Sequence, residues 1–288
     1  MTEPVLTPPR SRPDRCPGVL RPWAAEDGAL ARVRLVGGEI TVDQLLGLAD
    51  VAARYGDGRL HLTSRANLQL RALPTTSDGE LEPDVVAALG ATGLLPSHSH
   101  DLVRNVMVSP LTGLHGGRAD LRPTARAYDD LLCADPALAR LPGKFLAVLD
   151  DGRGDLVGHD LDLGAVAVDA RHAQVRAGAT GWGDVVPLDE LAPRLVELAR
   201  RFLELRGDGP AAAWHVDELD RPLLAASRRD TRTQVASGPL PFGDVGPGAH
   251  VEIPGGVLDR STLDEVVALA QTERLVVTPW RGLVVPTR

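Results

Sequence analysis

The sequence is poor in cysteine, aromatic residues and lysine, and each shortage limits what the chain can be. Cys16 and Cys133 are the only two cysteines among 288 residues. This excludes a disulfide framework and fits a reducing cytoplasm. Aromatic residues make up 3% of the chain, too few for platforms that stack single-stranded nucleic acid. The formal net charge of −8 also disfavours general nucleic-acid binding. Lys144 is the only lysine among 31 basic residues, which draws attention to it.

Long apolar runs are also missing. No stretch approaches the 18 apolar residues of a membrane-spanning helix, so we expect no membrane partner. The first 15 residues lack the apolar segment of a secretory signal and predict a flexible lead-in. The chain is 43% hydrophobic, which is ordinary for a folded protein. We therefore expect a cytoplasmic protein with at least two domains.

Two segments of the chain, 30–73 and 249–286, repeat one pattern. Each begins with a short alternating strand, continues through a Gly-Gly turn and a helix, and finishes with two strands around a polar turn. Thr41 with Gln44, and Thr262 with Glu265, predict a capping box at the start of each helix. One helix cannot cover a small sheet with open edges. The repeat therefore predicts two half-domains that pair around a pseudo-two-fold axis.

A different pattern separates the two repeats. It predicts a helix over 124–139 with Thr124 as its N-cap, strands at 144–149, 163–168 and 172–176, and a helix over 188–206. The expected fold class is α+β, with two ferredoxin-like half-domains and an inserted mixed α/β domain. The predicted segments are a lead-in (1–15), half-domain 1 (16–75), the inserted α/β domain (76–206), a connector (207–248) and half-domain 2 (249–288).

Four cationic side chains are candidates for binding an anion. Arg65 and Arg281 lie in the polar turns of the two repeats, so pairing of the halves directs both turns to one cleft or to its opposite ends. Arg104 is embedded in an apolar segment, and Lys144 opens another. A charge among apolar residues is costly unless it is paired, so each of the four could equally have a partner carboxylate or extend to solvent. Together they favour an anionic ligand.

The histidines give a weaker signal. In an extended segment His98 and His100 would share one face, which permits metal binding. The alternative is a polar loop after Pro96. No other metal-ligand pattern is present, because two cysteines cannot build a cysteine-rich cluster.

Several motifs in order resemble the nitrite/sulfite reductase superfamily. They are LHLTSRANLQLRAL, LVRNVMVSPLTG, LPGKFLAVLDDG and LVVTPWRGLVVP. CPGVLRP at 16–22 and the TPWRG turn are most similar to the precorrin-3B synthases of aerobic cobalamin biosynthesis. The resemblance implies two ferredoxin-like half-domains with inserted α/β domains. It also implies that Arg65, Arg104 and Lys144 contact anions.

The resemblance further implies a [4Fe-4S] cluster, with siroheme or non-heme iron. In the family a second α/β domain supplies the cysteine quartet, and this sequence stops at Arg288 after the second half-domain. We therefore expect that domain to be absent here, and the cluster to come from a separate polypeptide if there is one. Leu146 replaces a second family lysine, which weakens a sulfite- or nitrite-reducing site.

Four functions follow from this resemblance. The first is a precorrin-3B synthase-like oxidoreductase, or a component of one, that grips a polycarboxylate tetrapyrrole with Arg65, Arg104, Lys144 and Arg281. The second is a non-catalytic tetrapyrrole-binding protein, and the third an inactive remnant without its cluster. The fourth is a relative of the nitrite and sulfite reductases. The sequence favours the first and leaves the others open.

Overall fold

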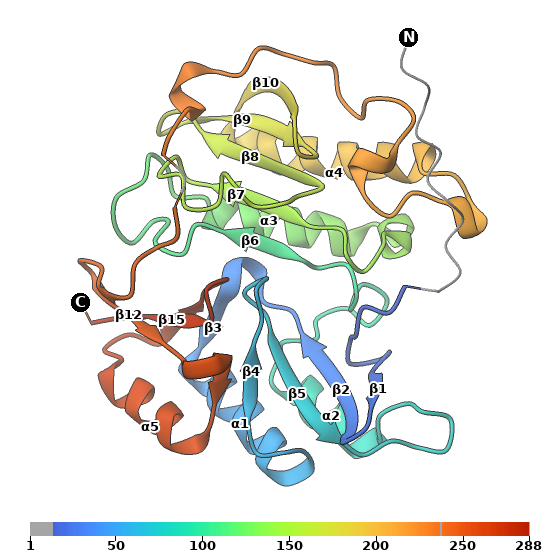
Figure 1. The fold of residues 1–288 in the computed structure, drawn as a ribbon, viewed down its shortest axis with the longest axis vertical. Helices are drawn as coiled ribbons and strands as arrows, with labels where there is room; N and C mark the ends of the chain where they lie inside the picture. Colours follow the sequence, from blue (N-terminus) through green and yellow to red (C-terminus); the bar gives the residue numbers. More distant parts are fainter. Residues whose placement is uncertain (1–13, 237, 288) are drawn as a thin grey trace.

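Three five-stranded sheets organise the protein in the computed structural model, which describes residues 14–236 and 238–287 (Figure 1). Residues 1–13 of the predicted lead-in lie outside the described residues. The first sheet has the order β1 (Trp23–Ala25), β2 (Gly28–Val33), β5 (Leu68–Leu73), β4 (Leu60–Leu62) and β13 (Val257–Leu258). Another has the order β11 (Gly243–Asp244), β12 (Gly248–Glu252), β15 (Gly282–Pro286), β14 (Arg274–Val277) and β3 (Glu39–Thr41). These two sheets belong to the two predicted repeats.

The two half-domains exchange a strand. β3 of the first half pairs antiparallel with β14 of the second, and β13 of the second half pairs antiparallel with β4 of the first. Each exchanged strand follows a short 3₁₀ turn, η1 (Val36–Gly38) or η6 (Pro254–Gly256). Gly38 is required here, because its φ is 74° and a Cβ would lie 2.1 Å from the carbonyl oxygen of Val277. The predicted pseudo-symmetric pairing of two ferredoxin-like halves is confirmed.

Both halves share one hydrophobic core, which contains buried residues of both sheets. The helices that contribute to it are α1 (Val42–Tyr55), α2 (Pro83–Ala91) and α5 (Arg260–Leu269). Leu45 and Leu48 of α1 are fully buried, and Leu263 and Val266 of α5 are 1% exposed. This i, i+3 spacing puts one stripe of each helix against the sheets.

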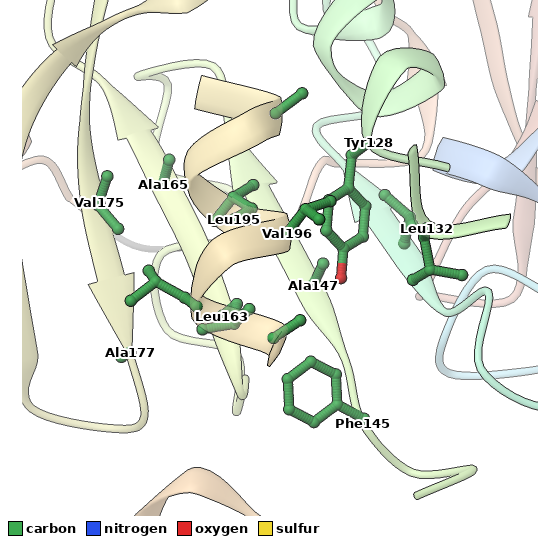
Figure 2. Packing of buried hydrophobic residues seen from close by; sticks show 14 of the residues in the cluster. Tyr128, Leu132, Phe145, Ala147, Leu163, Ala165, Val175, Ala177, Leu195 and Val196 are labelled. Atoms are coloured by element: carbon green, nitrogen blue, oxygen red, sulfur yellow. The ribbon is translucent and has the colours of Figure 1, made fainter. Parts of the chain in front are cut away.

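The third sheet is mixed, as expected for the inserted domain. Its order is β10 (Gly181–Pro187), β9 (His172–Ala177), β8 (Leu163–Ala167), β7 (Ala147–Asp150) and β6 (Val106–Val108). β6, β7 and β8 run parallel, whereas β8, β9 and β10 are antiparallel. One face packs on α3 (Arg122–Ala134) and α4 (Leu188–Leu205), where Tyr128 and Phe145 are 1% exposed (Figure 2). The other face carries a smaller apolar cluster that includes Met107, Leu146 and Val148.

The starts of α1 and α5 show whether the two predicted capping boxes form. Thr41 and Gln44 form the capping box as predicted, and Gly56 ends α1. The second capping box is wrong. Asp259 caps α5 by accepting a hydrogen bond from the Thr262 N–H at 2.9 Å, so Thr262 lies inside the helix. A carboxylate three residues earlier competes successfully with the threonine hydroxyl.

Two other boundaries differ from the prediction. Thr124 does not cap α3, because the helix begins at Arg122 with Pro123 in its first turn, where proline fits well. The helix ends at Ala134 and a separate 3₁₀ helix, η2 (Pro136–Arg140), follows, because Pro136 cannot continue an α-helix. The connector holds three 3₁₀ helices, η3 (Gly209–Ala211), η4 (Val216–Glu218) and η5 (Thr231–Thr233). In the described part of the chain, no helix has the length and apolar character needed to span a membrane.

Candidate anion-binding cleft

Strand β2 places two arginines on the open face of the first sheet. Ala31 and Val33 point into the shared core and are at most 3% exposed. Side chains alternate along a strand, so Arg32 and Arg34 point to the opposite face. Arg34 is nevertheless only 2% exposed, because the segment that precedes β6 covers it. A buried cation therefore lies between the first half-domain and the inserted domain.

These two arginines are incompletely paired. The Arg34 Nε donates to Oδ1 of Asn105 at 3.0 Å, and Nη1 donates to the carbonyl of Asp101 at 2.8 Å. The buried Nη2 of Arg34 and the buried Nε of Arg32 have no hydrogen-bond partner. A buried polar group without a partner costs about 1–3 kcal/mol, and more when it is charged. Such a cost is expected where a ligand supplies the missing acceptor.

Arg65 completes what we call the arginine cluster, Arg32, Arg34 and Arg65. Burial lowers the pKa of Arg34 to about 10, and the positive charges of Arg32 and Arg65 act in the same direction. Burial lowers the pKa of Arg32 too, with a contribution from Arg65. Three neighbouring cations form a strong positive field, which attracts an anion.

Arg65 also lines a cleft of about 500 Å³ between the first half-domain, the inserted domain and the connector. Its Nη1 donates to the Lys144 carbonyl at 2.9 Å, which brings the two predicted cations together. The Lys144 ammonium is exposed and forms no ion pair with any described residue. The cleft is lined by Arg65, Lys144, Leu146, Asp160, Leu161, Asp162, Trp214, His215, Asp217 and Glu218.

Asp162 and His215 form the floor of this cleft. Asp162 is 1% exposed, and its two carboxylate oxygens accept the backbone N–H groups of Leu146 at 2.8 Å and Val216 at 3.0 Å. Burial raises the pKa of Asp162 to about 6, although the charge of His215 opposes the shift. The Nε2 of His215 lies 3.8 Å from Oδ1 of Asp162. A titratable pair thus adjoins the two cations.

Arg104 has a different environment from the one predicted. It lies just before β6 rather than within a strand, and its Nε and Nη2 donate to the two oxygens of Asp129 at 2.8 and 2.7 Å. Burial alone would lower the pKa of Arg104, but the Asp129 carboxylate holds it above the ordinary value. Arg104 does not line the cleft. The structure therefore gives this arginine the partner carboxylate that the sequence left open.

The hydrogen bonds of the two hairpin turns also align their residues differently from the predicted repeat. The N–H of Thr63 donates to the carbonyl of Asn67 at 2.9 Å, and the N–H of Thr278 donates to that of Gly282 at the same distance. In this register Arg65 corresponds to Trp280. Ala66 corresponds to Arg281, and these residues share a positive φ of 55° and 59°. The pseudo-symmetric partner of Arg65 is therefore an indole ring.

Arg281 and Trp280 accordingly point to different places. A Cβ added to Gly256 would lie 2.9 Å from the Cδ of Arg281, so the Arg281 side chain covers η6. Arg281 is not among the residues that line the cleft. Trp280 packs on the apolar cluster that contains Leu146 and Leu161, which both line the cleft. The second turn thus contributes a ring beside the cleft, where the sequence predicted a cation.

The histidine pair is not assembled as a metal site. Both ring nitrogens of His100 have partners, since Nδ1 lies 2.9 Å from the hydroxyls of Ser97 and Ser99 and Nε2 lies 3.0 Å from the Asp135 carbonyl. His98 is exposed. Within the described ranges, no group of three histidine, cysteine, aspartate or glutamate side chains could hold a metal ion.

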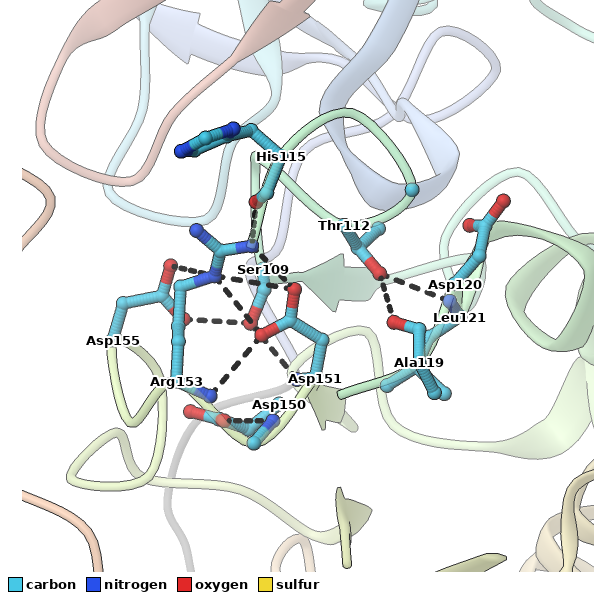
Figure 3. A network of polar contacts seen from close by, with 12 residues as sticks. Ser109, Thr112, His115, Ala119, Asp120, Leu121, Asp150, Asp151, Arg153 and Asp155 are labelled. Atoms are coloured by element: carbon cyan, nitrogen blue, oxygen red, sulfur yellow. Dashed lines mark hydrogen bonds and ion pairs between the residues drawn. The ribbon is translucent and has the colours of Figure 1, made fainter. Parts of the chain in front are cut away.

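A buried acidic network lies at the end of β7 (Figure 3). Asp150 accepts backbone N–H groups from Gly152, Gly154 and Leu156 at 2.8 to 3.0 Å, which folds the following loop around it. Asp155 accepts a hydrogen bond of 2.6 Å from the hydroxyl of Ser109. Burial raises the pKa of Asp155 to about 7. These contacts fix the loop that leads to Asp162.

Sequence reasoning missed four residues of the site, Arg32, Arg34, Asp162 and His215. The first two carried a readable signal, because an alternating Arg-x-Arg within an otherwise apolar strand places two cations on one face. The other two carried none, since the connector that brings His215 to Asp162 has no regular pattern. Only tertiary structure joins them.

Comparison with known proteins agrees with this architecture. Residues 24–81 match the family model described as the nitrite/sulfite reductase ferredoxin-like half domain. A precorrin-3B synthase from a Sinorhizobium species is 31% identical over 157 residues, covering 54% of this chain and 31% of that protein. A ferredoxin–nitrite reductase from Synechococcus elongatus is 28% identical over 217 residues, covering 66% of this chain and 41% of that protein. The matches thus span less than half of each of these relatives.

A solved structure, that of the Mycobacterium tuberculosis NirA protein, has the same fold over most of the chain. The TM-score is 0.62 with 17% sequence identity, over 90% of this chain and 54% of that one. The chain therefore contains a nitrite/sulfite reductase ferredoxin-like half domain and is related to the precorrin-3B synthases and to the nitrite and sulfite reductases.

Proposed function

We propose that this protein binds a polycarboxylate tetrapyrrole and acts as the substrate-binding component of a precorrin-3B synthase-like oxidoreductase. The observation that carries the proposal is the arginine cluster, in which buried guanidinium nitrogens of Arg32 and Arg34 lack partners. Arg65 joins this cluster to the cleft that Lys144 lines. Guanidinium groups suit carboxylates, because each forms charge-assisted and often paired hydrogen bonds.

A tetrapyrrole fits the residues that are present. Its peripheral carboxylates would accept hydrogen bonds from Arg65 and Lys144, which line the cleft, and the positive charges of Arg32 and Arg34 behind Arg65 would strengthen the attraction. Its apolar ring edge would lie near Leu146 and Leu161, which line the same cleft, with Trp280 packed behind them. When bound, the ring supplies the conjugated carbon framework on which the oxidation takes place. The chain's own residues bind and orient it.

A [4Fe-4S] cluster does not fit the residues that are present. Such a cluster takes four thiolates, and the sequence has two cysteines. Cys16 is 6% exposed beside Asp14, and burial raises the pKa of its thiol. Cys133 lies in α3. Burial and the Asp129 carboxylate raise the pKa of its thiol, and the charge of Arg104 opposes this shift. We propose that a separate polypeptide supplies the ligands of the cluster.

Titration with uroporphyrin, an octacarboxylate porphyrin, tests the proposal. We expect quenching of porphyrin fluorescence with saturable binding, and at least tenfold weaker binding for Arg65→Ala, since one charge-assisted contact contributes about 1.5–3 kcal/mol. Arg194→Ala, an exposed arginine of α4 that pairs with Glu197 at 2.6 Å, is the matched control. Equal affinities for the two variants would contradict the proposed site.

Iron and acid-labile sulfide in protein purified without oxygen test the enzymatic part. We expect neither in the isolated chain. A non-catalytic tetrapyrrole-binding protein is the second candidate, and the two-cysteine count favours it. Turnover that appears only when a cysteine-rich partner is added would support the oxidoreductase component. Tight porphyrin binding without turnover under those conditions would support the second candidate.

A further inference from the structure

The charges that line the cleft do not suit a polyanion as they stand. Two cations, Arg65 and Lys144, share the cleft with four carboxylates, Asp160, Asp162, Asp217 and Glu218. A ligand with several carboxylates is attracted by the first group and repelled by the second. A proton taken up by the cleft would reduce that repulsion. The question is which side chains can hold it.

Two of the four carboxylates accept hydrogen bonds from backbone N–H groups. Asp217 accepts the N–H of Ala179 at 3.0 Å, and Glu218 accepts that of Trp214 at 2.8 Å. Asp160 is exposed to solvent. Asp162 differs from all three because it is 1% exposed on the floor. It is therefore the carboxylate for which the charged form costs most.

The hydrogen bonds of His215 fix which ring nitrogen faces Asp162. The backbone N–H of Asp217 donates to Nδ1 of His215 at 3.1 Å. A backbone N–H always donates, so Nδ1 accepts and the neutral ring carries its proton on Nε2. That nitrogen lies 3.8 Å from Oδ1 of Asp162. The protonated nitrogen of the neutral ring is therefore the one that lies near the buried carboxylate.

We propose that Asp162 and His215 form the acid–base pair of the cleft, which takes up one proton from solvent when a polycarboxylate binds at Arg65 and Lys144. The inference rests on the proposed function for its ligand. A bound anion disfavours the charged carboxylate of Asp162, so this carboxylate takes up the proton, while Nδ1 of His215 stays an acceptor for the N–H of Asp217. The proton remains within reach of the bound ligand.

The other charged and titratable groups around the pair support this direction. The charge of Arg65 lowers the pKa of Asp162, and a bound carboxylate would neutralise that charge. Tyr128 of α3 is buried, and burial raises the pKa of its hydroxyl further above the ordinary value, so it stays neutral. The remaining groups that face the pair are Lys144, Asp160, Asp217 and Glu218. None of these is buried as Asp162 is.

The test measures uroporphyrin affinity between pH 6.0 and 8.5, where the porphyrin carboxylates stay ionised. One linked proton strengthens binding by up to about tenfold for each pH unit lowered. Calorimetry in phosphate and in Tris, which differ in ionisation enthalpy, counts the protons directly. We expect nearly one proton for the unmodified protein, and nearly none for Asp162→Asn, whose amide stays neutral at every pH of the series.

A matched control is available at another histidine–aspartate pair. His172 and Asp169 lie 2.9 Å apart at the start of β9 and do not line the cleft. His172→Gln should keep the full proton uptake. If the unmodified protein binds uroporphyrin with the same affinity at every pH and takes up no proton, the acid–base pair is wrong while the proposed function stands.

A second readout needs no ligand. The ring resonance of His215, followed by nuclear magnetic resonance, should change its titration midpoint by at least half a pH unit in Asp162→Asn, because the substitution removes the carboxylate that lies 3.8 Å from Nε2. If uroporphyrin fails to bind at every pH, the proposed function fails, and this measurement decides the pair alone. An unchanged midpoint would overturn it.

Discussion

Arg32 shows how one residue can be unfavourable for folding and favourable for binding. Its Nε is buried without a partner, and its charge is repelled by Arg34 and Arg65. Such an arrangement is costly in a folded protein. The side chain therefore has a role that the folded protein alone does not explain.

Arg32→Met should change stability and binding in opposite directions. Removing the unpaired cation should raise the free energy of unfolding by about 1 kcal/mol. Uroporphyrin binding should weaken at least tenfold, through loss of one charge-assisted contact. Urea denaturation and fluorescence titration measure the two effects. Loss of stability without loss of binding would mean that Arg32 is a structural residue.

Arg104 is the opposite case. Its side chain is 8% exposed, and Asp129, 11% exposed, pairs with it through both oxygens. Arg104→Met should lower the free energy of unfolding by about 3–5 kcal/mol, because it leaves a buried carboxylate unpaired. The double variant with Asp129→Leu should recover most of that loss. A stable Arg104→Met protein that fails to bind uroporphyrin would instead restore the anion-contacting role that the sequence predicted.

At the scale of elements, substitutions at the start of α5 distinguish its two candidate N-caps, Asp259 and Thr262. Asp259→Ala should cost about 1 kcal/mol of unfolding free energy, since the N–H of Thr262 loses its acceptor. Thr262→Ala should change stability by less than about half of that value, because its hydroxyl caps nothing. Thermal unfolding of the two variants measures the difference. Equal losses would show that the capping box predicted from the sequence forms after all.

Elements with strong local signals could be predicted from the sequence. The α4 helix and the capping box of α1 were confirmed because apolar periodicity and cap residues act within a few positions. The register of the repeat was not predictable. Arg65 and Arg281 look equivalent along the chain, but the hydrogen bonds of the turns pair Arg65 with Trp280. Whether a charged side chain meets a ligand or a carboxylate also depends on distant segments, as Arg104 and Asp129 show.

At the scale of the whole molecule, the buried network around Asp155 links stability to pH. Its pKa is raised to about 7 by burial, against an ordinary value of 3.8. The folded state therefore binds this proton more tightly than the unfolded state. The resulting stability is fully present below pH 4 and is lost as the pH rises through 7.

Raising the pH from 5 to 8 should lower the free energy of unfolding by an amount on the order of 3 kcal/mol from this group. Asp155→Asn should flatten that dependence, because the amide stays neutral. Asp169→Asn, at an exposed ion pair, should leave it unchanged. Urea midpoints across the pH series give the result. A stability that rises between pH 5 and 8 would contradict the buried, protonated Asp155.

The exchange of β3 and β13 has a consequence for the order of synthesis. β3 leaves the ribosome before its partner β14, which is made only after the inserted domain and the connector. The edge of β4 likewise stays unpaired until β13 has been made. A nascent chain therefore carries two unpaired strand edges while the inserted domain is being made. This is the interval in which a chaperone, or another copy of the chain, meets those edges.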